Sequence, residues 1–206
     1  METITLLTSD SDSIETARVF IANGELIAYP TDTVYGLSSS PFDSTAIEKI
    51  FLAKGRDFNK AVAILVGSVD QIEQVTKGFS NTAQHLAARF WPGALTLVVP
   101  ITPGLPGNIS PNATIGIRMP DHPFALSLLK SLGPLATTSA NLSGQTDAKN
   151  AQDVQIQLTG KIALILDGGA CPGGVPSTVV DCCQPEIRIL REGAIPRDMI
   201  HKAVQI

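Results

Sequence analysis

The chain has 206 residues, of which 44% are hydrophobic and 17% charged, and its 15 Lys and Arg against 19 Asp and Glu give a net charge of −4. This length predicts one domain spanning residues 1–206 with a sizeable buried core. The balance of apolar and charged residues excludes a disordered chain and a histone-like basic protein. The 17 Gly and 14 Pro indicate many turns, which excludes a coiled coil.

Short strands and helices alternate along the chain. In chain order, hydrophobic periodicity and turn signals predict a strand at 3–7, a helix at 12–22, a strand at 26–29, a helix at 44–54, a strand at 61–66, helices at 69–75 and 82–90, strands at 95–99 and 114–119, a helix at 124–132, a strand at 135–138, a helix at 153–158, strands at 162–166, 179–181 and 187–190, and a helix from 196. Ser11 is expected to cap the first helix and Gly24 to end it. Asp43 or Ser44 is expected to cap the second helix, which Gly55 ends.

This alternation predicts an α/β fold, in which helices cover a twisted, mixed and largely parallel sheet. Ligands of such folds tend to bind beyond the carboxyl ends of strands, so we expect the chemistry there.

The N-terminus and the cysteines bear on the compartment. The first residues, METIT, carry no basic residue, and no run of ~18 apolar residues exists, so neither a signal peptide nor a membrane span is predicted. The cytoplasm is the expected compartment. Three cysteines, two of them adjacent, fit neither a disulfide framework nor a zinc site, and we interpret them as reduced and structural. No metal ligand is assigned to the protein.

The two commonest phosphate-binding glycine loops are absent from the sequence. The pairs Gly168-Gly169 and Gly173-Gly174 are therefore interpreted as a mobile turn.

Polar side chains lie at the ends of three of the predicted strands. The segments 30–37 and 137–144 concentrate hydroxyl and amide groups, and Ser177 precedes another strand. Such turns can present hydrogen-bonding groups to a ligand, but the same side chains also satisfy turn backbone groups. The residues alone leave both interpretations open.

Lys54, Arg56 and Lys60 place three cations where a helix gives way to a strand, an arrangement that suits a triphosphate. The alternative is that Lys54 complements the helix dipole and Gly55 ends the helix. Three cations within seven residues exceed what one helix end requires.

Arg118 lies in a strand whose apolar residues alternate with Thr114, Gly116 and Arg118, so it belongs to the polar face, with room beside Gly116. Its guanidinium could hold a carboxylate or phosphate in a two-pronged contact, or form a partly exposed ion pair.

Seven segments, taken together, resemble the YrdC-like family, over roughly residues 14–195. They are PTDTVYGL at 30–37, KGR at 54–56, FWPGALT at 90–96, IR at 117–118, SANLSG at 139–144, STVVD at 177–181 and LR at 190–191. Each is weak alone, but their order and spacing are specific. The branch most similar to this chain consists of L-threonylcarbamoyladenylate synthases.

The resemblance implies a twisted α/β sheet with a large cationic cavity. It further implies a nucleotidyltransferase that converts L-threonine, bicarbonate and ATP, with Mg²⁺, into threonylcarbamoyl-AMP and pyrophosphate, for a downstream complex that modifies tRNA. By the same resemblance, the ATP-binding positions are Lys54, Arg56, Lys60, Ser139, Asn141 and Arg191, with Lys54 and Arg56 acting electrostatically, and the threonine-binding positions are Thr33, Tyr35, Arg118 and Ser177.

No nucleophile or general base is assigned, and Asp32 is retained only as a group that could orient others. The chain departs from the family's usual residues at 38–40, at Ala61 and at Glu192, which affects loop shape rather than the reaction. Its length predicts the short, single-domain form. The alternatives are an RNA-binding module, against which the net charge argues while leaving a weak RNA contact open, and an inactive paralogue.

Overall fold

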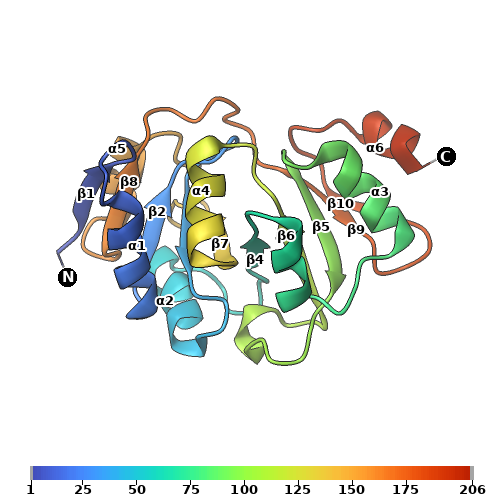
Figure 1. Cartoon of the computed structure of the whole chain (residues 1–206), viewed down its shortest axis with the longest axis horizontal. Helices are drawn as coiled ribbons and strands as arrows, with labels where there is room; N and C mark the ends of the chain where they lie inside the picture. The colour runs from blue at the N-terminus through green and yellow to red at the C-terminus, as the bar shows by residue number, and fades with distance from the viewer. Residues whose placement is uncertain (1, 205–206) are drawn as a thin grey trace.

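Ten strands form one sheet in the computed structural model, which describes residues 2–204 (Figure 1). The strands are β1 Ile4–Leu7, β2 Ile27–Tyr29, β3 Gly36–Ser39, β4 Ala63–Leu65, β5 Leu95–Pro100, β6 Thr114–Arg118, β7 Leu135–Ser139, β8 Leu164–Asp167, β9 Thr178–Asp181 and β10 Arg188–Arg191. They lie in the order β1-β8-β2-β3-β7-β4-β6-β5-β9-β10. The pairs β1–β8, β2–β8, β4–β6 and β5–β9 are parallel, and the other neighbours are antiparallel. The predicted mixed α/β sheet is confirmed, with four parallel and five antiparallel pairs of neighbouring strands.

Helices cover both faces of this sheet. They are α1 Ser13–Ala22, α2 Ser44–Lys54, α3 Asn81–Phe90, α4 Pro123–Leu132, α5 Ala151–Leu158 and α6 Arg197–Val204, with short 3₁₀ helices at Val69–Gln74 and Gly107–Ile109. The predicted helix at 69–75 is thus a 3₁₀ helix. Within residues 2–204, no helix is long and apolar enough to cross a membrane.

Side-chain alternation along the strands divides the core between the two faces. In β2, Ile27 and Tyr29 pack with residues of α1 and α4, whereas Ala28 belongs to the larger cluster that contains residues of α2, α3 and α5. α1 and α4 also contact each other, and they lie side by side over β2 and β7 in Figure 1. The sheet is therefore the central layer of the molecule.

Local capping signals account for most helix ends. Asp43 accepts hydrogen bonds from the backbone N–H groups of Thr45 and Ala46, and Gly55 adopts the left-handed conformation with φ of 58°, as predicted. The predicted cap Ser11 is wrong: Asp12 is the N-cap of α1, without a side-chain hydrogen bond to the helix, and the Ser13 N–H donates to the Asp10 carbonyl at 3.1 Å.

The sequence did not predict strand β3, which occupies the end of the segment interpreted as a turn at 30–37. Its residues GLSS lack the β-branched and aromatic side chains that mark strands. Tertiary contacts stabilise it instead, since Ser38 Oγ lies 2.7 Å from Thr137 Oγ1 and 3.3 Å from the Tyr29 hydroxyl. Pairing with β2 and β7 therefore makes this polar segment an interior strand.

Candidate functional site

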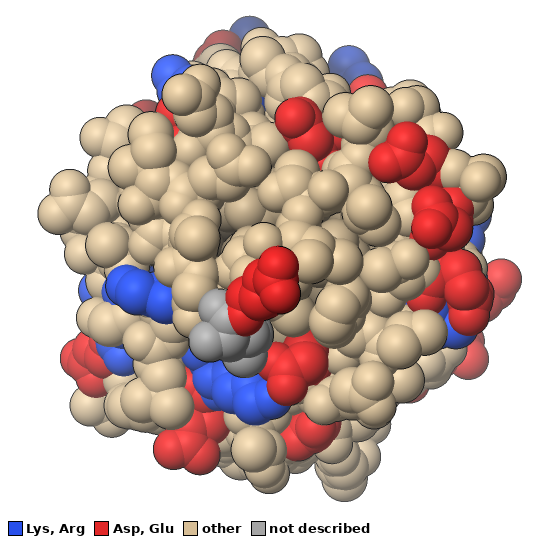
Figure 2. Space-filling model, turned by 90° about the vertical axis from the view of Figure 1, so that its left-hand side faces the viewer, with Lys and Arg blue, Asp and Glu red and all other residues tan. Residues whose placement is uncertain are grey.

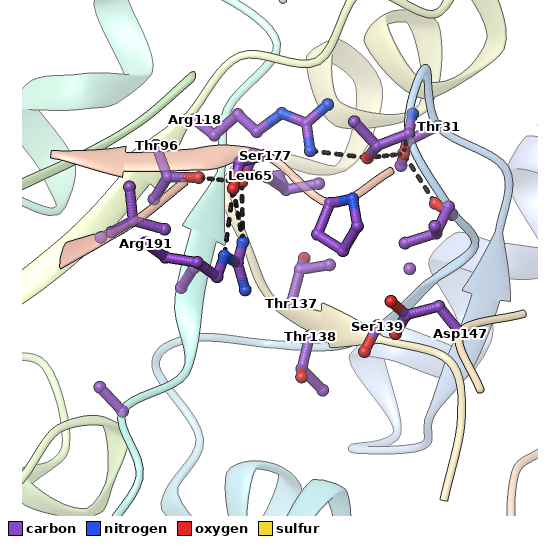
Figure 3. Close-up of a pocket in the computed structure, with 18 of the residues that line it drawn as sticks. Thr31, Leu65, Thr96, Arg118, Thr137, Thr138, Ser139, Asp147, Ser177 and Arg191 are labelled. Atoms are coloured by element: carbon purple, nitrogen blue, oxygen red, sulfur yellow. Dashed lines mark hydrogen bonds between the residues drawn. The ribbon is translucent and has the colours of Figure 1, made fainter. Parts of the chain in front are cut away.

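A cavity of about 390 Å³ lies over the middle of the sheet (Figure 3). Three adjacent strands each contribute two lining residues that lie two positions apart. They are Ala63 and Leu65 of β4, Thr96 and Val98 of β5, and Gly116 and Arg118 of β6. Such residues share one face of a sheet. The cavity thus extends over the sheet face itself, whereas we expected a site beyond the carboxyl ends of the strands. The remaining lining residues come from loops and neighbouring strands: Thr31, Thr33, Val34, Tyr35, Gly36, Arg56, Ala61, Thr137, Thr138, Ser139, Asp147, Pro176, Ser177, Val179, Leu190 and Arg191.

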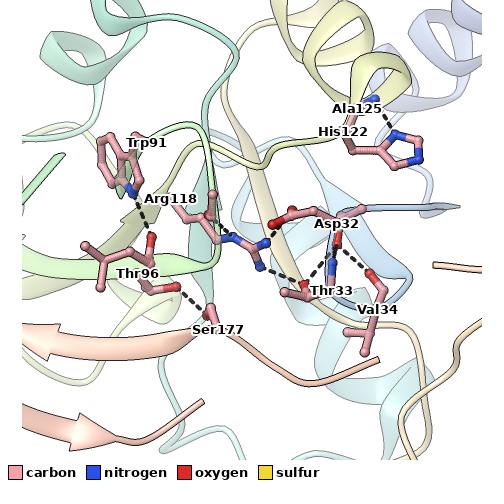
Figure 4. A network of polar contacts seen from close by, with 12 residues as sticks. Asp32, Thr33, Val34, Trp91, Thr96, Arg118, His122, Ala125 and Ser177 are labelled. Atoms are coloured by element: carbon pink, nitrogen blue, oxygen red, sulfur yellow. Dashed lines mark hydrogen bonds and ion pairs between the residues drawn. The ribbon is translucent and has the colours of Figure 1, made fainter. Parts of the chain in front are cut away.

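At one end of the cavity, the Arg118 guanidinium already has protein partners (Figure 4). Its Nε donates to the Gly93 carbonyl at 2.9 Å, Nη1 donates to Thr33 Oγ1 at 2.8 Å, and Nη2 forms an ion pair with Asp32. The side chains of Arg118 and Asp32 are only 7% and 13% exposed. Burial lowers the pKa of Arg118, and the Asp32 carboxylate opposes that shift. The charge at this end is therefore neutralised before any ligand binds.

The turn that carries Asp32 and Thr33 is fixed by its own hydrogen bonds. Thr31 Oγ1 donates to the Val34 carbonyl at 2.7 Å and accepts the Thr33 N–H at 3.1 Å. Tyr35 lines the cavity, and its hydroxyl donates to the Gly169 carbonyl at 2.8 Å. The structure therefore brings the predicted Thr33, Tyr35 and Arg118 together at one end of the cavity.

Of the glycine pairs that we interpreted as a mobile turn, the pair at 173–174 is hydrogen-bonded to the turn at this end of the cavity. The N–H groups of Gly173 and Gly174 donate to the carbonyls of Asp32 and Thr33 at 3.1 and 2.7 Å. A Cβ at Gly173 would lie 2.4 Å from the Asp32 carbonyl oxygen, so only glycine permits this approach. The close approach of two loops was not visible in the sequence.

Ser177 lies between the two ends of the cavity, and Thr96, which the sequence did not single out, is its partner. Their hydroxyl oxygens are 2.7 Å apart, in a contact where either can donate. Arg191 reaches the same residue, since its Nε and Nη2 donate to the Ser177 carbonyl at 3.1 and 2.8 Å. Ser177 and Arg191, which the resemblance assigned to different substrates, therefore lie in direct contact.

Arg56 lies at the other end, with few partners. Its Nη2 donates to the Ala61 carbonyl at 2.9 Å, and its buried Nε has no hydrogen-bond partner. Burial lowers the pKa of Arg56, and the charge of Arg191 lowers it further. Asp147, also missed by the sequence, lines this end and raises the pKa of Arg191. Two like charges and an unpaired donor make this end suitable for an anion.

Lys54 is buried at the end of α2 and lies behind the cavity rather than in its lining. Its Nζ donates to the carbonyls of Ser139 and Asn141 and to Asn141 Oδ1. Burial, with the Arg56 charge, lowers the pKa of Lys54 to about 8, while Asp147 opposes the shift. Ser139 lines the cavity in front of this cluster, whereas Asn141 does not.

Lys60 does not reach the cavity lining. Its side chain is exposed in the turn after α2, where its N–H donates to the Asp57 carbonyl at 3.1 Å. The left-handed Gly55 redirects the chain between Lys54 and Lys60, which separates cations that lie close together in the sequence.

The described residues contain no cluster of three or more side chains that could hold a metal ion. The cysteines at 171, 182 and 183 are free, as predicted, and burial raises the pKa of Cys171 to about 11. These thiols are consequently poor nucleophiles near neutral pH.

Comparison with known proteins gives a consistent result. The family model Sua5/YciO/YrdC, described as "Telomere recombination", matches residues 19–193. The threonylcarbamoyl-AMP synthase of Bacillus subtilis (strain 168) is 39% identical over 204 residues, which cover 96% of this chain and 58% of that protein. The structure of P. abyssi Sua5 complexed with L-threonine aligns with a TM-score of 0.93 and 38% identity over 100% of this chain and 61% of that chain. The structure of E. coli YciO aligns with a TM-score of 0.82 and 26% identity, covering 93% of this chain and 94% of the other. The chain thus spans less than two thirds of the first two relatives.

Proposed function

Because the chain belongs to the Sua5/YciO/YrdC family, we propose that it is a nucleotidyltransferase that makes threonylcarbamoyl-AMP and pyrophosphate from L-threonine, bicarbonate and ATP. The observation that carries the proposal is the convergence of Arg56, Arg118 and Arg191 on one cavity. The names of the B. subtilis and P. abyssi relatives supply the reaction and the amino acid.

The two ends of the cavity suit two different substrates. We assign threonine to the end formed by Thr33, Tyr35, Arg118 and Ser177, where hydroxyls and one paired guanidinium can orient a small zwitterion. ATP is assigned to the other end, where Arg56 and Arg191 form no salt bridge with any of the described residues and Ser139 adds a hydroxyl. Lys54 and Asn141 lie behind Ser139 and belong to the nucleotide end.

The reaction joins these substrates in two steps. The threonine ammonium group loses a proton to solvent, the resulting amine attacks bicarbonate, and loss of water leaves a carbamate. A carbamate oxygen then attacks the α-phosphorus of ATP, the bond to the β-phosphate oxygen breaks, and pyrophosphate leaves. Two anions must approach each other, and at ~4 Å a like-charged pair costs about 4 kcal/mol at an effective dielectric near 20. The residues of this chain therefore act chiefly by neutralising and positioning the anions.

Mg²⁺ is part of the proposal as the partner of ATP. The residues present fit an ion held mainly by phosphate oxygens, because Asp147 is the acidic side chain that lines the nucleotide end of the cavity. When bound, the ion would add positive charge near the leaving pyrophosphate.

The proposal extends to the whole activity and to its setting in the cell. The chain spans less than two thirds of the B. subtilis relative, and we propose that this portion carries the synthase activity. A downstream complex would use the product to form threonylcarbamoyladenosine in tRNA, and the cytoplasm would supply the ATP and the tRNA.

Mass detection of threonylcarbamoyl-AMP tests the proposal directly. The purified protein is incubated with ATP, Mg²⁺, threonine and bicarbonate, and each substrate is omitted in turn. Product that requires all three substrates supports the proposal, and the absence of product from a folded protein contradicts it.

An RNA-binding module without chemistry is the alternative from another class. On the face in Figure 2, Lys and Arg side chains lie beside Asp and Glu rather than forming a basic surface. Because the net charge of the chain is −4, we expect calorimetry to detect ATP and threonine binding at physiological salt under conditions where gel shifts detect little RNA binding. Sub-micromolar RNA binding without any heat from ATP would favour the RNA-binding module.

A further inference from the structure

Lys54 differs from the arginines of the cavity in how its donors are used. A lysine ammonium has three N–H donors and no acceptor. Three acceptors surround Lys54 Nζ, namely the carbonyl oxygens of Ser139 and Asn141 and the side-chain oxygen of Asn141, the last at 3.2 Å. The donors are therefore matched by the protein itself, and none is left for a phosphate oxygen.

The position of Lys54 agrees with this count. The residue is 3% exposed and is not among those that line the cavity. Arg56, two residues later, lines the cavity and keeps a buried Nε without a partner. The two cations of the KGR segment thus have different surroundings.

The segment that Lys54 holds reaches the nucleotide end of the cavity through Ser139. The Lys54 carbonyl also accepts the Ser143 N–H at 2.8 Å, so both the backbone and the side chain of this residue hold the segment 139–143. Within the segment, Ser139 Oγ donates to Asn141 Oδ1 at 2.5 Å, and Asn141 Nδ2 donates to the Gln145 carbonyl at 2.7 Å. Ser139 is the member that reaches the cavity.

We propose that Lys54 is a positioning residue, which fastens residues 139–143 in the shape that presents Ser139 to the nucleotide, and that it does not contact the phosphates. Its charge strengthens the hydrogen bonds to the buried carbonyl groups. This inference rests on the proposed function for the identity of the nucleotide. Direct contacts with the phosphates are then made by Arg56 and Arg191, which line the cavity.

The first test uses ligands that differ only in phosphate number. Calorimetry measures the affinity of adenosine, AMP and ATP for the wild-type protein and for Lys54→Met, Arg56→Met and Lys161→Met. A positioning role predicts that Lys54→Met weakens all three ligands by a similar factor, roughly 10-fold. Arg56→Met should weaken ATP far more than adenosine, and Lys161→Met, at an exposed position outside the cavity, should change none of them. A loss for Lys54→Met that is absent for adenosine and grows with phosphate number would overturn the inference.

A second variant separates charge from shape. Lys54→Arg keeps the positive charge, but a planar guanidinium does not fit three acceptors arranged around one ammonium nitrogen. The positioning role therefore predicts that Lys54→Arg weakens the three ligands as Lys54→Met does. Near-normal ATP affinity in Lys54→Arg would show that charge alone is needed and would contradict the inference.

Hydrogen exchange tests the fastening without any ligand or turnover. The amides of residues 139–145 should exchange at least about 10-fold faster in the Lys54 variants than in the wild type, while those of the distant helix α1 stay unchanged. Unchanged exchange in 139–145 would overturn the inference. If the wild type makes no threonylcarbamoyl-AMP, the proposed function fails, whereas the exchange result still decides whether Lys54 holds this segment.

Discussion

The two ends of the cavity differ in how much of their positive charge is already neutralised. At the threonine end, Asp32, Thr33 and the Gly93 carbonyl occupy the Arg118 guanidinium. At the nucleotide end, Arg56 and Arg191 have no acidic partner within salt-bridge distance among the described residues, and Arg56 Nε has no partner at all. A zwitterion needs orientation with little net charge, whereas a triphosphate needs cations that no carboxylate has neutralised.

Arg56→Met removes a cation from the nucleotide end of the cavity and should have the largest effect on activity. A preorganised cation that faces developing charge is typically worth ~3–4 kcal/mol, so product formation should fall by about 100- to 1000-fold. The free energy of unfolding should change little, because Arg56 makes a single hydrogen bond to Ala61. Product is measured by mass detection and stability by urea titration, with the exposed Lys161→Met as the control. Near-normal turnover in Arg56→Met would refute the assignment of this end to the triphosphate.

Asp32→Ala removes the carboxylate that neutralises Arg118 at the threonine end of the cavity. Removing one partner of a buried ion pair leaves the other charge unpaired, so we expect the free energy of unfolding to fall by about 3 kcal/mol. Glu192→Ala is the matched control, since its pair with Arg197 is more than half exposed and should contribute less than about 1 kcal/mol. Urea titration of both variants decides the matter. Equal losses would mean that burial does not distinguish the two pairs.

Arg118→Lys sharpens the assignment of substrates to the two ends. The variant keeps the charge but cannot serve Gly93, Thr33 and Asp32 with one planar fork. We expect the KM for threonine to rise by roughly 10- to 100-fold and the KM for ATP to change much less. Steady-state kinetics with each substrate varied in turn provide the measurement. Equal changes in both KM values would argue against placing the threonine carboxylate at Arg118.

The pH dependence of nucleotide binding gives the smallest expected effect. The folded pKa of Lys54 is lowered to about 8 from 10.5, so Lys54 loses its proton in the folded protein as the pH rises through about 8. One donor to the 139–143 segment then disappears, and ATP affinity should fall by up to about 10-fold between pH 7.5 and pH 9.

The sign for stability is the opposite. Between the folded and unfolded pKa values, the unfolded chain binds more protons, so the contribution of Lys54 to the free energy of unfolding rises with pH.

Calorimetry between pH 7.5 and pH 9 should show the fall in ATP affinity in the wild type and not in Lys54→Met. Asp147→Asn removes a group that raises the pKa of Lys54 and should move this fall to lower pH. A fall that persists in Lys54→Met would assign the titration to another group.

Short-range chemistry made much of this molecule predictable. The Asp43 cap and the left-handed Gly55 that bound α2 follow from residues within two or three positions of each helix end. The alternation around Gly116 correctly placed Arg118 on the face of β6 opposite Ile117. The family resemblance further grouped the segments that meet at the cavity, although Lys60 lies outside its lining.

Only the tertiary structure decided which partners these residues have. Asp32 pairs with Arg118 across 86 residues of sequence, and Lys54 reaches Asn141 across 87. The polar segment 36–39 becomes a strand because β2 and β7 flank it, and the glycines at 173–174 bind the site turn because two distant loops meet. Caps and side-chain alternation are set by neighbouring residues along the chain, so the sequence alone determines them. The partner of a buried charge depends on which strands and loops lie side by side in the sheet. That arrangement is set by the packing of the whole chain and not by neighbouring residues.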